Sequence, residues 1–197
     1  LAHFGAKVLH PFSVRPAVLA GIPIRILNTF NPKCPGTFIE NAHRDLGVPF
    51  KSVTCKKGVT IVRITTPRML LAWGYLVKIA SVFARHQVSI DLIATSEVSV
   101  SMSIEESPAE DSSFVRDLSA HGDVHLQPGQ SIISIVGTEM QKGHGIQGRI
   151  FDVLNRNNIA VRMASLGNSL LNLSIVVDDA DCERSVELLH REFFPAN

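Results

Sequence analysis

Residues 59–104 read VTIVRITTPRMLLAWGYLVKIASVFARHQVSIDLIATSEVSVSMSI, and this stretch decides the fold because a similar stretch follows it. A shift of 71 positions aligns it, without a gap, with residues 130–175. Identical positions in the first stretch include Ile61, Ile64, Met69, Gly74, Ile79, Arg85, Ser103 and Ile104. Two copies are too few for a solenoid, which needs about three stacked repeats to bury a continuous core. The repeat therefore predicts a duplicated small domain.

Within the first copy, the spacing of apolar residues alternates between the period of a strand and that of a helix. The predicted strands are residues 59–64, 88–93, 98–104 and 123–126, and the predicted helices begin at Gly74 and at Ser112 or Ser113. The first helix is expected to end near His86 and the second near His121. The serine at the start of the second helix is expected to cap it. The order is β-α-β-β-α-β, the ferredoxin-like split unit.

The second copy follows the same order but ends one strand short. Its predicted elements are strands at 131–136, 159–164 and 171–177 and helices at 146–157 and 181–193. A strand-like segment, Phe50 to Cys55, precedes the first copy. Because an open sheet edge is usually covered, we expect this segment to supply the missing strand. The first domain would then be inserted in the second, with boundaries at 57–128 and at 50–56 plus 129–197.

Residues 1–49 differ from the repeats. They are rich in Pro and Gly and contain one short helix candidate and one strand, residues 22–27. Such a segment cannot bury a core alone. We therefore expect it to be the tail of a larger domain, with Leu1 at a cut made inside that domain.

Composition excludes several classes of function. The chain has 197 residues, of which 45% are hydrophobic, and its formal net charge of +1 gives no field that would attract nucleic acid or an anionic membrane. Its longest apolar runs are too short to span a bilayer, and no signal peptide opens it, so a cytoplasmic location is expected. Three cysteines, Cys34, Cys55 and Cys182, are expected to be reduced thiols.

Two further motifs are set aside. Residues 143–148 fit G-x-G-x-x-G, but no strand directly precedes them and Asn168 stands where a dinucleotide site needs an acid. His121 and His125 have the spacing of metal ligands but lack companions, so solvated histidines are favoured. No metal site is expected.

Three stretches carry a resemblance to aspartate kinases (aspartokinases). Residues 5–11 (GAKVLHP), 22–25 (IPIR) and 28–37 (NTFNPKCPGT) resemble the end of the amino-acid kinase domain. Residues 89–101 (SIDLIATSEVSVS) resemble the effector segment of the first ACT domain, most closely that of lysine-sensitive members. The resemblance covers essentially the whole chain. It implies an α+β fold with two ferredoxin-like ACT domains, preceded by the tail of the kinase domain.

The resemblance also implies that catalysis and regulation belong to different parts of the parent enzyme. The parent enzyme would transfer the γ-phosphoryl group of MgATP to the β-carboxylate of aspartate. The N-terminal Lys-Phe-Gly-Gly-type motif of the family is absent here, so this fragment should be inactive, with no catalytic residue and no cofactor of its own. Lys7 corresponds to a lysine of the nucleotide site and is expected to be vestigial. The ACT domains are expected to bind an end-product amino acid, L-lysine or alternatively threonine, for feedback inhibition.

The residues themselves suggest how an amino acid would bind. Gly74 lies where a loop becomes a helix, so the amides that follow can hold a carboxylate. Asp91 lies in a strand otherwise apolar, where a buried carboxylate needs a cation such as the lysine ε-ammonium. The resemblance assigns Met69, Gly74, Tyr75 and Leu76 to the loop side of the site, and Ile90, Asp91, Thr95, Ser96 and Glu97 to the strand side.

Alternatives remain open for these residues. Asp91 could face solvent or pair with Lys78 or Arg63, and residues 95–97 could form only a polar turn. Ala72 stands where lysine-sensitive members can have serine, and threonine-sensitive relatives carry a similar effector segment. The second copy has Arg162 in place of Asp91, so it is expected to serve in dimer packing or as a weaker site, with contacts from Asn168 and Asn172.

The alternative function is a free-standing pair of ACT domains that acts as a regulatory subunit or a dimerisation module. A fusion of the parent with another biosynthetic enzyme is a third alternative. In each case a homodimer joined through ACT units is expected, because association covers the edge strands of the sheet.

Overall fold

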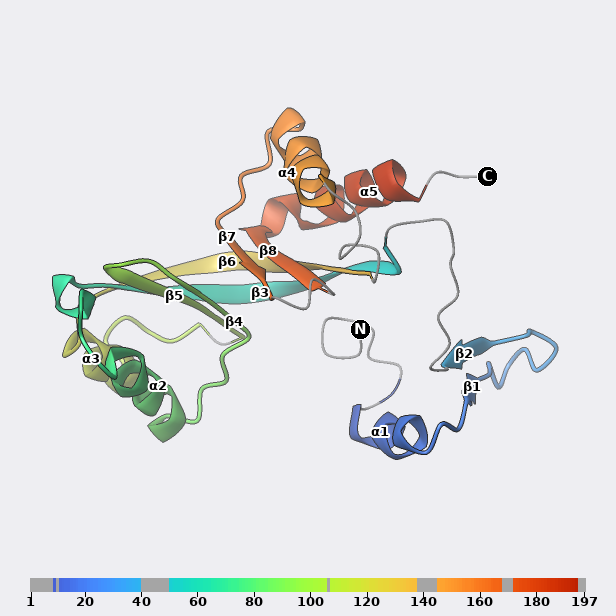
Figure 1. The fold of residues 1–197 in the computed structure, drawn as a ribbon, viewed down its shortest axis with the longest axis horizontal. Helices are drawn as coiled ribbons and strands as arrows, with labels where there is room; N and C mark the ends of the chain where they lie inside the picture. The colour runs from blue at the N-terminus through green and yellow to red at the C-terminus, as the bar shows by residue number, and fades with distance from the viewer. Residues whose placement is uncertain are drawn as a thin grey trace. The chain divides into compact units, whose positions relative to one another are not determined.

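The computed structural model describes residues 9, 11–39, 50–105, 107–137, 145–167 and 172–194 (Figure 1). The chain falls into two compact units, Leu1–Val48 and Pro49–Asn197, and each is considered by itself. No helix in the described parts is both long and apolar enough to cross a membrane.

The smaller unit consists of helix α1 (Pro11–Leu19) and an antiparallel pair of short strands, β1 (Ile24–Ile26) and β2 (Thr37–Ile39). The predicted strand at residues 22–27 is confirmed as β1, whereas β2 was not predicted. None of the described side chains of this unit is buried. The unit therefore has no core of its own among these residues. Its origin in a kinase domain stays a prediction, and Lys7 lies outside the described residues.

The larger unit is built on one six-stranded antiparallel sheet with the order β4-β5-β3-β6-β8-β7. Its strands are β3 (Ser52–Thr65), β4 (Leu92–Thr95), β5 (Ser99–Ile104), β6 (Asp123–Val136), β7 (Met163–Leu166) and β8 (Asn172–Asp178). Its helices are α2 (Tyr75–Arg85), α3 (Ser113–Ser119), α4 (Ile146–Arg156) and α5 (Cys182–Phe193), with short 3-10 turns at Pro67–Met69 and Asp179–Asp181. As predicted, Ser112 caps α3, because its side chain accepts a hydrogen bond from Val115 N.

The two central strands, β3 and β6, each have 14 residues and serve both repeats. The register runs from Ser52 opposite Val136 to Thr65 opposite Asp123. The first residues of β3 thus pair with the second repeat's part of β6, which confirms the predicted pairing of the segment before the first copy. The predicted strands at 123–126 and 131–136 were wrong in one respect, since they form a single strand. The inserted-domain division stays a prediction.

A bulge interrupts the β3–β6 pair at its middle. The register shifts on either side of Val59, and Gly58 and Gly129 both adopt left-handed conformations, with φ of 72° and 69°. These glycines are 71 positions apart, so the duplication is visible in the backbone. Two more such pairs occur among the described residues, Gly74 with Gly145 and Gln87 with Asn158. Bulges increase the local twist of a sheet, and this one lies where the two repeats meet.

Successive residues of β3 and β6 supply three buried clusters, because side chains of a strand alternate between faces. Val62 and Ile64 pack against α2 and α3, and Ile133 and Ile135 pack against α4 and α5. The two helix pairs lie on opposite sides of the sheet (Figure 1). The third cluster joins the helix-free faces of the two repeats and consists of Val59, Ile61, Leu92, Ile132, Met163 and Val176. Both repeats therefore contribute to a shared core.

One predicted strand began too early in each repeat. The segment expected at 88–93 becomes a strand only at Leu92, and that expected at 159–164 only at Met163. Val88 N instead donates to Phe83 O at 3.0 Å, which closes the end of α2, and Ile159 N makes the equivalent bond. Asp91 therefore lies just before β4 rather than within a strand.

Gly58 provides a test of the bulge. A Cβ there would meet nothing within 4 Å, so Gly58→Ala changes only the cost of the left-handed backbone. We expect a loss of about 1 kcal/mol in the free energy of unfolding, measured by urea denaturation. Gly148, inside α4 and equally open, is the control, and Gly148→Ala should stabilise by about 0.5–1 kcal/mol. Equal effects of both changes would contradict the assigned backbone at Gly58.

The cysteines provide a second test. Burial of Cys182 and its contact with the Cys55 thiol raise the pKa of Cys182 to about 11, whereas Cys34 is exposed. Because a thiol reacts as its thiolate, iodoacetamide at pH 8 should alkylate Cys34 in the folded chain and spare Cys182 until the chain is unfolded. Peptide mass spectrometry measures both. Equally fast alkylation of the two residues before unfolding would rule out the buried position.

Candidate functional site

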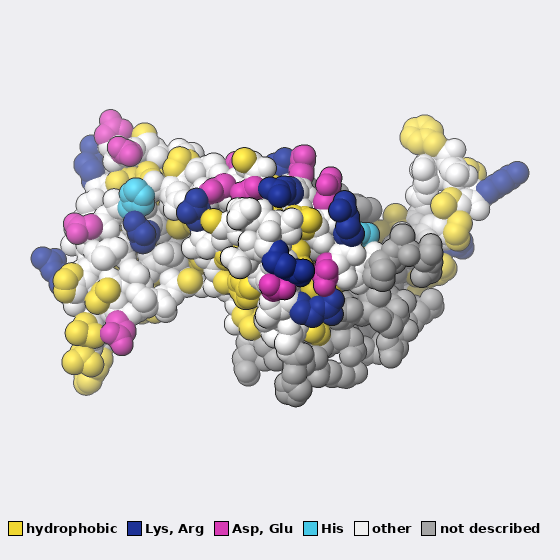
Figure 2. All heavy atoms as spheres, turned by 90° about the horizontal axis from the view of Figure 1, so that it is seen from above, with side chains coloured by type: hydrophobic (Ala, Val, Ile, Leu, Met, Phe, Trp, Pro, Cys, Tyr) yellow, Lys and Arg dark blue, Asp and Glu magenta, His cyan; other side chains and the backbone are white. Residues whose placement is uncertain are grey.

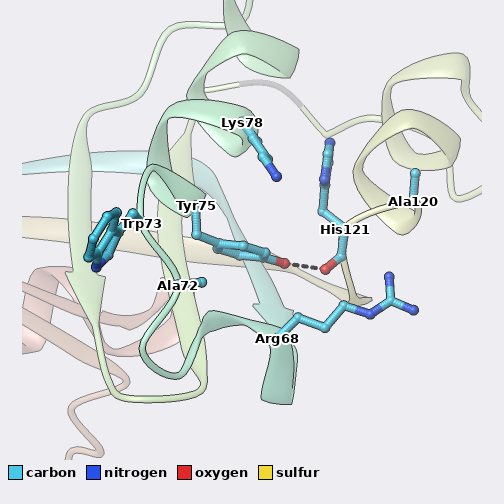
Figure 3. A pocket seen from close by; sticks show the side chains of 7 residues that line it. All are labelled: Arg68, Ala72, Trp73, Tyr75, Lys78, Ala120 and His121. Carbon is cyan, nitrogen blue, oxygen red and sulfur yellow. Dashed lines mark hydrogen bonds between the residues drawn. The ribbon is translucent and has the colours of Figure 1, made fainter.

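A cavity of ≈ 290 Å³ lies where the loop after β3 meets the turn between α3 and β6 (Figure 3). It is lined by Arg68, Ala72, Trp73, Tyr75, Lys78, Ala120 and His121. Three of these seven residues are basic or can become so, two are aromatic, and none is acidic. Its volume is close to the lower limit of about 300 Å³ for small-molecule sites. The lining therefore suits a small anionic group.

The first turn of α2 opens at this cavity. Gly74 is the N-cap residue with φ 70° and ψ 14°, and no side chain caps the helix. The first amides of a helix have no intrahelical acceptor and carry the positive end of the helix dipole. Lys78 N is the first to bond within the helix, to Gly74 O at 3.3 Å. The amides before it are available to a carboxylate, as the sequence predicts.

Tyr75 fixes the cavity against the rest of the first repeat. Its ring is buried beside α3, and its hydroxyl donates a hydrogen bond to the backbone carbonyl of His121 (Figure 3). The next residue, Gly122, lies close against the end of β3, since a Cβ there would be 2.7 Å from Thr65 O. The contact ties the start of α2 to the turn before β6. His121, predicted to be solvated, is half-buried and lines the cavity.

The other predicted loop-side residues lie at the same end of the sheet. Met69 packs partly buried against the core of the first repeat, and Leu76 is exposed on α2. The exposed turn at residues 95–97 lies nearby, because Thr66 N donates to Val98 O at 2.8 Å. Ser96 closes this turn through its side chain, as the polar-turn alternative requires. A role of Thr95, Ser96 and Glu97 in binding stays a prediction.

Asp91 and Ile90 lie at the opposite end of β4. Thr95 is four positions after Asp91, which corresponds to roughly 13 Å of extended strand. The Asp91 side chain is only 5% exposed, and its Oδ2 lies 2.8 Å from Lys56 Nζ. It thus pairs with Lys56, and the expected alternatives of solvent, Lys78 or Arg63 were wrong. Within one chain, the loop side and Asp91 do not come together.

Lys56 also contacts Glu105, with 2.5 Å between Nζ and Oε1. Burial by itself would lower the pKa of Lys56, but hydrogen bonds and charge from Asp91 and Glu105 outweigh it and raise that pKa. Lys56 therefore keeps its charge throughout the physiological range.

The predicted set omitted Arg68, Trp73, Lys78 and His121. Arg68 and Lys78 had a detectable signal, since basic residues on both sides of a helix-opening glycine favour an anion. His121 had none, because it is 47 positions from Gly74 and only tertiary packing brings it close. No group of three or more His, Cys, Asp and Glu side chains suited to a metal occurs in the described ranges.

The corresponding region of the second repeat differs. Gly145 opens α4 with φ 85°, but the loop before it and Asn168 lie outside the described residues. Arg162 forms a two-pronged ion pair with Asp178, with N···O distances of 3.2 and 2.7 Å. Hydrogen bonds from Arg162 and then Gln130 lower the pKa of Asp178. Asn172 donates to Ser174 Oγ at 3.1 Å. Arg162 is thus already paired with Asp178 of the same chain.

Large apolar side chains are exposed on the outer strand β4, on the turn that follows it, on α2 and on the loop before α2. They are Leu70, Leu71, Trp73, Leu76, Val77, Ile93 and Val98, with Trp73 98% exposed. We call these residues the apolar patch. Figure 2 shows hydrophobic side chains gathered at that end of the molecule. No described strand pairs with the outer edge of β4. An open edge beside exposed apolar residues is typical of an association surface.

Comparison with known proteins finds similar domains, sequences and structures. A model described as ACT domain matches residues 133–193. Aspartokinase 3, chloroplastic, from Arabidopsis thaliana is 39% identical over 202 residues, which cover 98% of this chain and 36% of the relative. The chain thus spans little more than a third of that protein.

Two solved structures are also similar. E. coli aspartokinase III in complex with lysine and aspartate, in the T-state, has 32% identity and a TM-score of 0.81, covering 98% of this chain and 44% of that one. A putative C-terminal regulatory domain of aspartate kinase from Porphyromonas gingivalis also has 32% identity, with a TM-score of 0.62, covering 74% of this chain and 99% of that one. The chain belongs to the aspartokinase family and corresponds to its C-terminal ACT-domain region.

Proposed function

We propose that this chain is the regulatory part of an aspartate kinase and binds an end-product amino acid, L-lysine, at its first repeat. Binding would inhibit the phosphorylation of aspartate by MgATP in a kinase domain that lies outside this region. The observation that carries the proposal is the uncapped start of α2 at Gly74, which opens into a cavity with Arg68 and Lys78. The lysine complex of the E. coli relative supports the choice of effector.

The α-carboxylate of the effector fits the start of α2. The free amides after Gly74 would donate to it, and Arg68 and Lys78 would add charge. Hydrogen bonds to an ionised acceptor are roughly twice as strong as neutral ones. The cavity lining itself offers no carboxylate, so the ammonium groups of the effector need acceptors from outside it.

A second copy of the chain can supply such an acceptor. If two copies pair antiparallel through β4 about a twofold axis at Ile93, Asp91 of one copy lies opposite Thr95 of the other. Asp91 then approaches the Thr95–Glu97 turn and the loop that opens α2. The same association covers much of the apolar patch. The two halves of the predicted site, separated within one chain, would meet between two.

Lysine and threonine make different demands on this composite site. The ε-ammonium of lysine needs a buried carboxylate, which Asp91 provides, whereas the hydroxyl of threonine does not. A free-standing regulatory subunit is the second candidate function. Residues 11–39, which bury no described side chain, favour attachment to a kinase domain because they have no core of their own.

Calorimetry of lysine binding tests the effector assignment. Asp91→Asn should weaken L-lysine binding by roughly 2–4 kcal/mol, the range for removing one partner of a buried charge pair. Arg162→Ala, at the equivalent position of the second repeat, should leave the affinity within about a factor of three. Equal losses in both variants would contradict the assignment, as would tight threonine binding that ignores Asp91.

Sedimentation tests the shared site. The wild type should be a dimer at micromolar concentration, and Ile93→Lys should give monomers, because a charge on an edge strand blocks edge pairing. Leu166→Lys, at a matched exposed position on the outer strand β7, should leave the dimer intact. A wild-type monomer with and without lysine would refute pairing through β4, and so would dissociation caused by Leu166→Lys alone.

A further inference from the structure

Lys56 lies between two carboxylates at the junction of the repeats. Its Nζ is 2.8 Å from Asp91 Oδ2 and 2.5 Å from Glu105 Oε1. Asp91 is nearly buried, Lys56 is 17% exposed, and Glu105 is 68% exposed. A buried carboxylate must be neutralised or paired, and here a side chain of the same chain pairs with it.

The triad of Lys56, Asp91 and Glu105 joins elements of different repeats. Lys56 belongs to the part of β3 that pairs with Ile132, next to the bulge at Gly58. Asp91 precedes β4 and Glu105 follows β5, and both of these strands belong to the first repeat.

The triad has no counterpart in the second repeat. The positions 71 residues on are Gln127, Arg162 and Val176. The cluster therefore forms only around the carboxylate of the first repeat, which is the repeat proposed to bind an effector.

We infer that Lys56 is an internal competitor of the effector for Asp91, and that an incoming primary ammonium group displaces it. The inference rests on the proposed function, because it takes Asp91 as the acceptor of the effector. The side chain of Lys56 presents the same group as free lysine, an ammonium on a four-carbon chain. In the effector-free chain Asp91 is thus already paired with a substitute.

Glu105 makes the exchange feasible. When Lys56 leaves Asp91 it keeps a partner that is largely exposed, so no buried ammonium is left unpaired. Displacement also changes the contact between the repeats, because Lys56 is carried by the second repeat's part of β3. An amino acid without a side-chain ammonium cannot make this exchange. Lys56 would therefore determine specificity and transmit binding to the second repeat.

Calorimetry with L-lysine and L-norleucine tests the inference, since norleucine is lysine without its ε-ammonium. Lys56→Met should tighten lysine binding about tenfold and leave norleucine binding unchanged. Glu105→Gln should weaken lysine binding severalfold, because Lys56 then depends on Asp91 alone. The matched control is Lys57→Met, which lies on the same strand as Lys56. This change removes an exposed ion pair with Glu183 of α5 and should change neither affinity.

The outcomes separate the two proposals. If the wild type binds lysine and Lys56→Met binds it with the same or a weaker affinity, the competitor role of Lys56 is overturned and the proposed function stands. A wild type that binds neither lysine nor threonine overturns the proposed function. In that case, the appearance of lysine binding in Lys56→Met supports the competitor role. If Lys56→Met does not bind lysine either, the competitor role is overturned as well. Should Lys56→Met fail to fold, an unchanged lysine affinity in Glu105→Gln overturns the inference.

Discussion

The antiparallel pairing of β3 with β6 is the constraint on which the rest of the larger unit depends. One half of each strand belongs to the first repeat and the other half to the second, so the two four-stranded parts form one continuous sheet. The bulge at Gly58 and Gly129 lies where the repeats meet, and the helix-free faces meet there around Ile61 and Ile132. The hydrophobic burial that stabilises either repeat is therefore partly shared with its neighbour.

The candidate site uses both ends of β3. Its final residue, Thr65, leads into the loop that opens α2 at Gly74, where a carboxylate fits. Its first half carries Lys56, which holds Asp91. A ligand that engages the loop of one copy and Asp91 of another would thus contact structure connected directly to the second repeat. The physical link is a continuous strand rather than a flexible linker.

The features predicted from sequence are those fixed by local pattern. The periodicity of residues 59–104 predicts the strand and helix order, Ser112 predicts a cap, and the strand count predicts a partner for residues 50–55. The continuity of β3 and β6 was missed because the repeat pattern marks their halves as separate strands. The partner of Asp91 was missed because Lys56 is 35 positions away and becomes its neighbour only through sheet register. His121 was not predicted to line the cavity because it is 47 positions from Gly74 and only tertiary packing brings it close, whereas the position of Gly74 at the start of α2 followed from its place between loop and helix.

Hydrogen exchange with and without L-lysine tests most directly whether the shared strands connect the binding site to the second repeat. The expected result is a change in amide exchange at residues 66–77 and 90–97, together with a change at residues 52–58 and 129–136, because β3 and β6 are common to both repeats. A change confined to the first repeat, with residues 52–58 and 129–136 unaffected at saturating lysine, would contradict a connection through the shared strands.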